Sequence, residues 1–163
     1  MALAVELARQ NVIHQSGGPF GAVVVDSLRN KIVGWGANSV LSSGSIFHAE
    51  VCALWDAQYR LGVASLESTP KHQYALVTSA APCAMCAGAA VWSGVARIAT
   101  GASTSDVEHL VGFDEGPLPK DIVREFKKRG IAVKRNVLRQ ECCEVLREYV
   151  SRGGAVYGRR RVA

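Results

Sequence analysis

Two short segments of the sequence carry residue types that bind metal ions and transfer protons. His48-Ala49-Glu50 forms one segment, and Pro82-Cys83-Ala84-Met85-Cys86 forms the other. Imidazole and thiolate are preferred zinc ligands, and cysteines three residues apart on a helix present both sulfurs on one side. The start of a helix also lowers the pKa of a thiol toward the thiolate that zinc requires. We therefore predict a zinc site with His48, Cys83 and Cys86 as its ligands.

The predicted ligand set points to a catalytic zinc site, because three protein ligands leave the fourth tetrahedral position open. Water at such a position has a pKa of about 7 and supplies a nucleophile at neutral pH. Glu50, two residues after His48, is the expected proton carrier for that water. Residues i and i+2 point apart within a helix, so this pairing requires an irregular helix entry. The loop-like segment Ser43-Gly44-Ser45 lies just upstream, as that requires.

Other uses of the cysteines explain the sequence less well. The five cysteines, at positions 52, 83, 86, 142 and 143, are an odd number with an adjacent pair, which makes a poor disulfide framework. A structural zinc knot needs a fourth ligand, but Cys142-Cys143 is no second C-x-x-C, and Cys52 falls on an apolar helix face. A redox pair would leave the His-x-Glu segment without a role. A non-catalytic zinc or thiol module that binds a partner is the alternative from another class.

The elements that position these residues follow from hydropathy spacing and from glycine and proline. The spacing predicts helices over 2–15, 48–61, 83–93, 119–129 and 137–150, and strands over 20–26, 31–36, 74–78, 96–100 and 131–135. Residues 101–119 hold three glycines and two prolines around a short helical stretch, and form a candidate functional loop. The order predicts an α/β fold, a three-layer α-β-α sandwich with a mixed five-stranded sheet and sites where strands end and helices begin.

Length and composition are those of an ordinary globular protein. The 163 residues are 48% hydrophobic and 20% charged, so we expect a single domain over residues 1–163. No apolar run approaches the roughly 20 residues that span a bilayer, and the first residues do not resemble a secretory signal, so we expect a cytoplasmic protein without membrane contact. Part of the net charge of +5 comes from Arg159-Arg160-Arg161, interpreted as a solvated end rather than an RNA contact.

The two metal-site segments belong to a longer resemblance. H-x-E together with P-C-x-x-C is the recognised signature of zinc-dependent base deaminases. With Gly18 to Val25, Asn38 and Trp92 to Val95, the chain resembles the cytidine deaminase superfamily over roughly residues 2–135, in the branch that holds guanine, cytosine and tRNA adenosine deaminases. The segment Gly112-Phe113-Asp114-Glu115-Gly116-Pro117 is similar to bacterial guanine deaminases that also accept ammeline, an aminotriazine.

The resemblance implies a cytidine deaminase-like fold, zinc as cofactor, and roles for four residues around a planar base. Asn38 would hydrogen-bond the edge of the base, Phe20 and Phe113 would pack against its ring, and the Ala49 N–H would meet a ring carbonyl. Aromatic faces and a few fixed donors suit a neutral heterocycle. A turn residue at Asn38, a core residue at Phe20 and a loop anchor at Phe113 are the alternative interpretations.

A second carboxylate is expected to help ammonia leave, since ammonia departs only after protonation. Asp114 and Glu115 are both available, and Glu115 is the preferred group. A solvated acidic pair in a turn is the alternative. The resemblance also implies a homodimer in which the segment from about residue 101 exchanges between subunits and caps the partner's site, so that Glu115 would act in trans.

The implied reaction is the hydrolysis of guanine to xanthine and ammonia, with ammeline or another aminotriazine as a further substrate. Deamination of cytosine, of a nucleoside, or of adenosine in tRNA is the alternative. A basic surface around the pocket would favour RNA, but lysine and arginine are scattered through this sequence. Ala81 stands before Pro82 where relatives usually have glutamate, and the loss of a supporting carboxylate there bears on the substrate.

Overall fold

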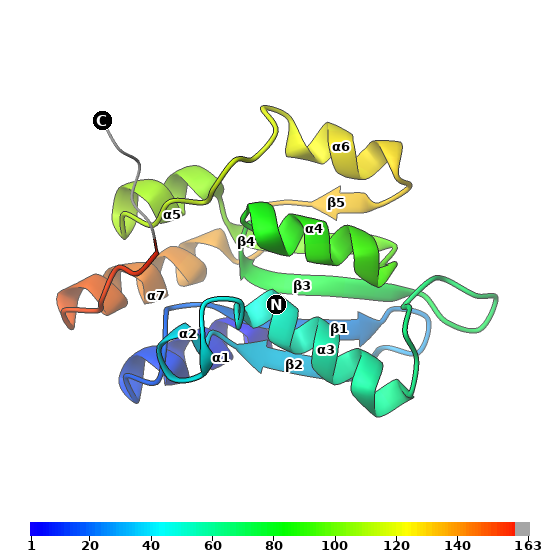
Figure 1. Ribbon diagram of the computed structural model, residues 1–163, viewed down its shortest axis with the longest axis horizontal. Helices are drawn as coiled ribbons and strands as arrows, with labels where there is room; N and C mark the ends of the chain where they lie inside the picture. Colours follow the sequence, from blue (N-terminus) through cyan, green and yellow to red (C-terminus); the bar gives the residue numbers. More distant parts are fainter. Residues whose placement is uncertain (159–163) are drawn as a thin grey trace.

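The computed structural model describes residues 1–158, and its elements follow the predicted order (Figure 1). Arg159, Arg160 and Arg161, interpreted above as a solvated end, lie outside the described residues. The helices are α1 (Ala2–Ile13), α2 (Val40–Ser43), α3 (Ala49–Leu61), α4 (Ala84–Ser93), α5 (Thr104–Leu110), α6 (Ile122–Lys128) and α7 (Arg139–Ser151). The strands are β1 (Gly21–Asp26), β2 (Lys31–Ala37), β3 (Tyr74–Ala80), β4 (Arg97–Ala102) and β5 (Ala132–Lys134).

The five strands form one mixed sheet in the order β2-β1-β3-β4-β5. The predicted hairpin pairs β1 with β2 in antiparallel fashion, and β1 also pairs antiparallel with β3. The pairs β3–β4 and β4–β5 are parallel, as expected for strands separated by helices. Strand β3 is buried along nearly all of its length, because helices cover both faces of the sheet at its centre.

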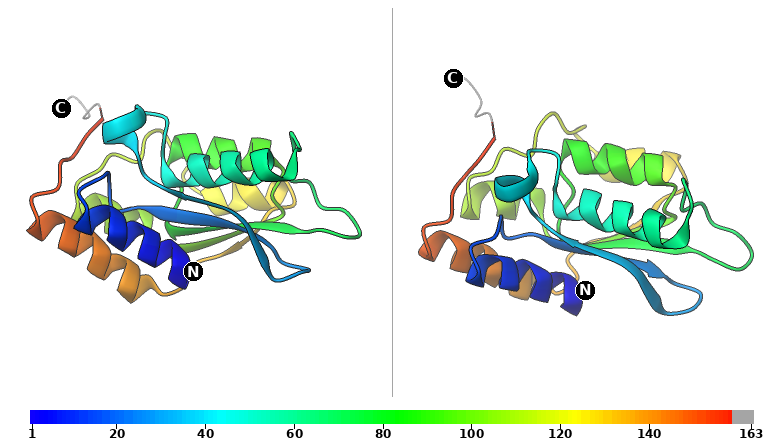
Figure 2. Two further views of the ribbon diagram at one scale, coloured as in Figure 1. Left: turned by 90° about the horizontal axis from the view of Figure 1, so that it is seen from below. Right: turned by 60° about the horizontal axis from the view of Figure 1, so that its bottom comes forward.

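The helices form one layer on each side of the sheet (Figure 2). Helices α1 and α7 pack together on one face, whereas α3 and α4 cover the other. The predicted three-layer α-β-α sandwich is therefore confirmed. Two buried apolar clusters fill the spaces between these layers, one beneath α3 and α4 and one between α1, α7 and the sheet.

Close approach of α3 to the sheet depends on Gly36 in β2. A Cβ atom at Gly36 would lie 2.6 Å from the Ala49 carbonyl oxygen and 2.5 Å from the Cys52 Cβ atom. The absence of a side chain therefore lets the first turn of α3 sit directly against β2. At its other end α3 stops at Gly62, whose φ of 66° is the left-handed conformation expected of a C-terminal cap.

Apart from shifts of up to three residues in the bounds of the predicted elements, the structure shows one unpredicted helix and one unexpectedly exposed side chain. The sequence did not predict α2, because four residues carry no helical periodicity; the helix begins where the Val40 N–H donates to Asn38 Oδ1. Trp55 shares the helical spacing of the apolar residues of α3, yet its side chain is 65% exposed and stacks on Tyr59. Within residues 1–158, no helix combines the length and the apolar composition needed to cross a bilayer.

Candidate active site

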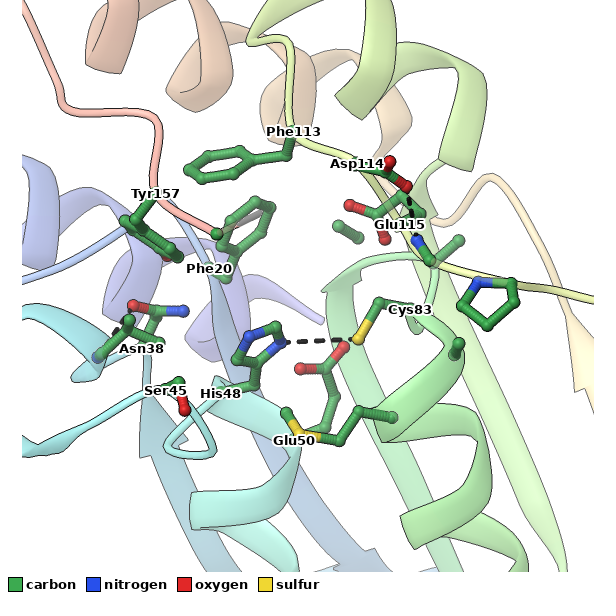
Figure 3. A pocket seen from close by; sticks show the side chains of 18 residues that line it. Phe20, Asn38, Ser45, His48, Glu50, Cys83, Phe113, Asp114, Glu115 and Tyr157 are labelled. Atoms are coloured by element: carbon green, nitrogen blue, oxygen red, sulfur yellow. Dashed lines mark hydrogen bonds between the residues drawn. The ribbon is translucent and has the colours of Figure 1, made fainter. Parts of the chain in front are cut away.

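The three predicted metal ligands meet between the starts of α3 and α4 (Figure 3). His48 and Cys83 are the N-terminal cap residues of the two helices and have extended backbones, while Cys86 lies in the first turn of α4. Their ligand atoms all lie within 4.8 Å of one another, and the Cys83 Sγ atom is 3.5 Å from His48 Nδ1. The sequence segments are 35 positions apart, and the fold brings them to one point.

The donor set fits zinc in both chemistry and size. Zinc bonds of about 2.0–2.3 Å at tetrahedral angles place ligand atoms ~3.3–3.8 Å apart, and the spacing of His48 Nδ1 and Cys83 Sγ falls in that range. One imidazole and two sulfurs are ligands that zinc commonly takes. The two thiols share a hydrogen bond that shifts their pKa values in opposite directions. A hydrogen bond from Cys86 lowers the pKa of Cys83 to about 4. The pKa of Cys86 is raised, because its hydrogen bond to Cys83 and its burial favour the neutral thiol.

Glu50 faces the same point from the first turn of α3. The backbone of His48 is extended and lies outside the helix, so the side chains of residues 48 and 50 converge, as the predicted irregular helix entry requires. Glu50 is 5% exposed. Its Oε1 accepts a hydrogen bond of 3.2 Å from Thr78 Oγ1, and its Oε2 accepts one of 3.4 Å from Cys86 Sγ. Burial, followed by the negative charge of Cys83, raises the pKa of Glu50.

Thr78 was not predicted as a site residue. It lies on β3, its side chain is fully buried, and its hydroxyl holds one oxygen of the Glu50 carboxylate. A threonine in a buried strand reads as a β-branched core residue, so the sequence gives no signal for this contact. Only the pairing of β3 against the start of α3 shows it.

The loop between α5 and α6 places the two remaining carboxyl groups differently. Glu115 is buried, whereas Asp114 is exposed and its Oδ1 accepts a hydrogen bond of 2.8 Å from the Gly116 N–H. The Glu115 carbonyl oxygen accepts a hydrogen bond of 2.9 Å from the Ala84 N–H at the start of α4. Burial, and then the negative charges of Cys83 and Glu50, raise the pKa of Glu115 to about 8. At neutral pH the Glu115 carboxyl group is therefore largely protonated.

Aromatic rings form the wall opposite the ligands. The ring centroids of Phe20 and Phe113 are 5.5 Å apart, and those of Phe113 and Tyr157 are 4.7 Å apart. The sequence predicted Phe20 and Phe113 but not Tyr157, which follows α7 near the end of the described chain. A lone tyrosine after Gly153-Gly154 carries no motif, and only the return of this segment across the site reveals it (Figure 3).

Asn38 lies beside this wall and is 1% exposed. Its Oδ1 accepts hydrogen bonds from the Gly18 N–H at 3.0 Å and the Val40 N–H at 3.2 Å. Among the buried side-chain atoms of residues 1–158, Asn38 Nδ2 and the Tyr157 hydroxyl make no hydrogen bond of good geometry. Figure 3 shows the Asn38 amide nitrogen directed toward the centre of the site. Unpartnered buried polar atoms of this kind are costly unless a ligand or water satisfies them.

A cavity of about 310 Å³ joins these groups. Phe20, Asn38, His48, Glu50, Cys83, Phe113, Asp114 and Glu115 of the predicted set line it, together with Ala81 and Tyr157. Ala49 does not line the cavity; it is the fully buried first residue of α3, so a role for its N–H stays a prediction. None of the described residues that line the cavity is lysine or arginine. The described lining instead combines apolar and aromatic side chains with carboxyl groups and the Asn38 amide.

Fold and site together define a zinc-dependent deaminase, and comparison with known proteins agrees. The family model for the cytidine and deoxycytidylate deaminase zinc-binding region matches residues 1–102. The chain belongs to this family, and it is a zinc-dependent aminohydrolase.

Both sequence relatives and solved structures include guanine deaminases. The structure of the guanine deaminase from Nitrosomonas europaea has a TM-score of 0.87 at 39% identity, covering 92% of this chain and 82% of that one. The guanine deaminase of Bacillus subtilis is 36% identical over 129 residues, which are 78% of each chain. The tRNA-specific adenosine deaminase of Buchnera aphidicola is 33% identical over 132 residues, 80% of this chain and 79% of the relative. The family is therefore shared by enzymes of free bases and enzymes of RNA.

Proposed function

We propose that this protein hydrolyses guanine to xanthine and ammonia, with aminotriazines such as ammeline as further substrates. The observation that carries the proposal is the cavity itself. It is small, walled by Phe20, Phe113 and Tyr157, and free of lysine and arginine among the described residues. The Asn38 Nδ2 atom, which makes no hydrogen bond of good geometry, lies at one side. At about 310 Å³ the cavity lies at the small end of ligand pockets, which run from roughly 300 to 1,000 Å³.

Ligands of similar proteins support a purine. Solved structures 40% identical to this chain hold the protein NE0047 with 8-azaguanine and with 2,6-diaminopurine, at TM-scores of 0.87. 8-Azaguanine is a purine analogue and 2,6-diaminopurine is a purine, and both are flat, carry an amine and have no sugar. Their binding to a protein of this fold agrees with a small cavity that offers aromatic faces.

The proposed mechanism uses the two buried carboxyl groups in turn. Zinc held by His48, Cys83 and Cys86 would make a water molecule nucleophilic at neutral pH. Glu50 accepts a proton from the attacking water and delivers it to a ring nitrogen of the base. Thr78 fixes the orientation of the Glu50 carboxylate through the 3.2 Å hydrogen bond. Water adds its oxygen to the ring carbon that bears the amine, and the ring C=N double bond opens as the ring nitrogen takes the proton from Glu50. Protonation of the amine then lets the carbon–nitrogen bond break, and the added hydroxyl group loses its proton to become the carbonyl oxygen, so xanthine and ammonia balance guanine and water.

Glu115 is the proposed acid for the leaving amine. Burial raises its pKa and so favours the protonated form that an acid requires, and Glu115 lines the same cavity as Glu50. Asp114 is less suited, because it is exposed and its Oδ1 accepts from a backbone N–H in a turn. Two carboxyl groups in different environments can thus carry two successive proton transfers.

Binding of the base is assigned to the remaining residues. Phe20 and Phe113 pack against the ring, Asn38 donates from Nδ2 to an acceptor on the edge of the base, and Tyr157 closes the pocket. The Tyr157 hydroxyl has its pKa raised above its usual range by burial, and it stays neutral as a donor or acceptor.

We also propose a homodimer, in which the exposed aromatic side chains of α3 and α4 form the contact surface between the two copies. Trp55 and Tyr59 of α3 are 65% and 74% exposed, and Trp92 of α4 is 87% exposed. Exposed apolar surface of this kind favours contact with another chain. Exchange of the segment from about residue 101 stays a prediction; Tyr157 as described lines the cavity of its own chain. Sedimentation should give a dimer for the natural sequence and a monomer for Trp92→Glu.

A panel assay tests the proposed substrate. Zinc-loaded protein is incubated separately with guanine, ammeline, cytosine, guanosine and an anticodon stem-loop RNA, and ammonia, xanthine and inosine are measured. We expect ammonia from guanine and none when Glu50 is replaced by glutamine. Ammonia from cytosine or guanosine but not from guanine would contradict the proposed substrate and identify the alternative one. Inosine in the RNA, with no reaction of the other substrates, would identify the protein as an RNA deaminase. Absence of ammonia from every free base and triazine would refute it.

A further inference from the structure

The side chain of Asn11 ties together two segments that reach the cavity, although Asn11 itself lies on α1 and does not line the cavity. Its Nδ2 donates to the Gly18 carbonyl oxygen at 2.8 Å and to the Asn38 carbonyl oxygen at 2.6 Å. Its Oδ1 accepts a hydrogen bond of 2.5 Å from the Ser16 hydroxyl group. Asn11 is 6% exposed, and both hydrogens of its amide nitrogen are used. Such a saturated buried amide fixes the groups that it contacts.

Contacts in the other direction close a ring of hydrogen bonds. The Gly18 N–H donates back to Asn38 Oδ1 at 3.0 Å, and the Val40 N–H donates to the same oxygen at 3.2 Å. The ring is tightly packed: a Cβ atom at Gly17 would lie 1.9 Å from the Asn38 carbonyl oxygen and 2.8 Å from Asn11 Nδ2. Both the backbone and the side chain of Asn38 are therefore held from the side away from the ligand.

The ring also decides which atom of the Asn38 amide faces the cavity. Two backbone N–H groups require an acceptor, so Oδ1 turns toward Gly18 and Val40, and Nδ2 is left to point inward (Figure 3). Amide orientation of this kind is set by the surrounding hydrogen bonds. A donor at this point selects a base that presents an acceptor, such as a carbonyl oxygen or an unprotonated ring nitrogen.

We infer that Asn11 is a positioning residue for the deaminase site, which holds Asn38 so that its Nδ2 donates to the base. The inference rests on the proposed function in one respect, the role of Asn38 in binding the base. Asn11 connects α1 to the ends of the β1–β2 hairpin, so this helix contributes to substrate recognition without touching the substrate.

The first test needs no substrate. Hydrogen exchange at the Gly18 and Val40 amides is measured by NMR in the zinc-loaded natural protein and in Asn11→Ala. We expect at least about tenfold faster exchange at both amides, because both depend on the position of Asn38 Oδ1. Faster exchange at Gly18 alone would show that Asn11 supports only the glycine turn, and would overturn the inference.

Ser16→Ala and Val12→Ala serve as companion variants. Ser16→Ala removes the group that orients Asn11 and should accelerate the same two amides less strongly, which keeps the test available if Asn11→Ala folds poorly. Val12→Ala removes apolar packing from the same helix, where Val12 is 2% exposed, and should leave the ratio of these two amides to the rest of the protein unchanged. Equal acceleration in Val12→Ala would indicate general loosening and contradict the inference.

The second test is a double-mutant cycle. Its kinetic constants are measured with a substrate from which the natural protein releases ammonia. Asn11→Ala should raise KM about tenfold and change kcat by less than threefold, because binding is lost while the proton carriers remain. In an Asn38→Ala background the same change should alter KM by less than threefold. Multiplicative effects would show independent roles and overturn the inference. If the natural protein releases no ammonia from any base, the proposed function fails, and the exchange measurement still decides the role of Asn11.

Discussion

The N–H of Ala84 donates a hydrogen bond of 2.9 Å to the carbonyl oxygen of Glu115. This contact fastens the loop that carries the second carboxyl group to the helix that carries both cysteines. The loop and α4 therefore keep a fixed relation, and the buried Glu115 side chain faces the negative charges of Cys83 and Glu50. The proton transfer proposed for Glu115 depends on that fixed relation.

Replacing Glu50 with glutamine should abolish turnover and leave the fold intact. Loss of a general base and acid costs typically 10²–10⁴-fold, so kcat should fall at least about 1,000-fold. Glutamine has nearly the same shape and avoids the burial of a charge, so the thermal midpoint should not fall. Zinc content and ammonia release are measured together, with Glu125→Gln, a partly buried glutamate that does not line the cavity, as control. A Glu50→Gln protein with more than a tenth of the natural activity would contradict the assigned role.

Removing zinc should stop the reaction. It should also lower the free energy of unfolding, but the metal-free protein should still fold. Chelation should reduce ammonia release more than about 100-fold, and one equivalent of zinc should restore it. The chain buries two apolar clusters apart from the ligands, so the metal-free protein should still unfold cooperatively. Cys86→Ser should lose zinc, whereas Cys142→Ser, buried away from the site, should retain it. Full activity in protein shown to be zinc-free would refute the metal assignment.

Glu115 should make the stability of the metal-free protein depend on pH. Its pKa of about 8 in the folded protein lies above the ordinary 4.5, so the stability it contributes is complete below pH 4.5. That contribution is lost as the pH rises from 4.5 through 8, and is on the order of a few kcal/mol. Urea unfolding of the natural protein and of Glu115→Gln, each at pH 5 and pH 9, measures it. The natural protein should lose more stability than Glu115→Gln; equal losses would place the Glu115 carboxyl group in water.

Shortening the aromatic wall should weaken substrate binding. Phe113 contacts both Phe20 and Tyr157, and an aromatic contact of this kind contributes about 0.5–1.5 kcal/mol beyond area burial. Phe113→Leu should therefore raise KM about three- to tenfold and change kcat less. Steady-state kinetics with guanine, the proposed substrate, check this, with Phe126→Leu as a buried control away from the cavity. An unchanged KM would remove Phe113 from the binding surface.

The sequence alone predicted the metal ligands and Glu50 as the candidate proton carrier, because these residue types occur at short, characteristic spacings. Cys83 and Cys86 share one turn, and His48 and Glu50 share one helix entry, so local geometry places each pair correctly. The alternation of strands and helices was also local, and it predicted the mixed sheet and the three layers. Helix α2 was not predicted, because its four residues are too few to show helical periodicity.

The tertiary structure decided which distant residues line the site or contact the residues that do. Thr78, Tyr157 and Asn11 belong to a buried strand, a C-terminal segment and the first helix, and no spacing links them to His48 or Glu50. It also separated Glu115 from Asp114, because burial of one side chain and exposure of its neighbour depend on packing against α4. Contacts between residues far apart in the chain depend on how the layers pack, so a local sequence pattern does not predict them.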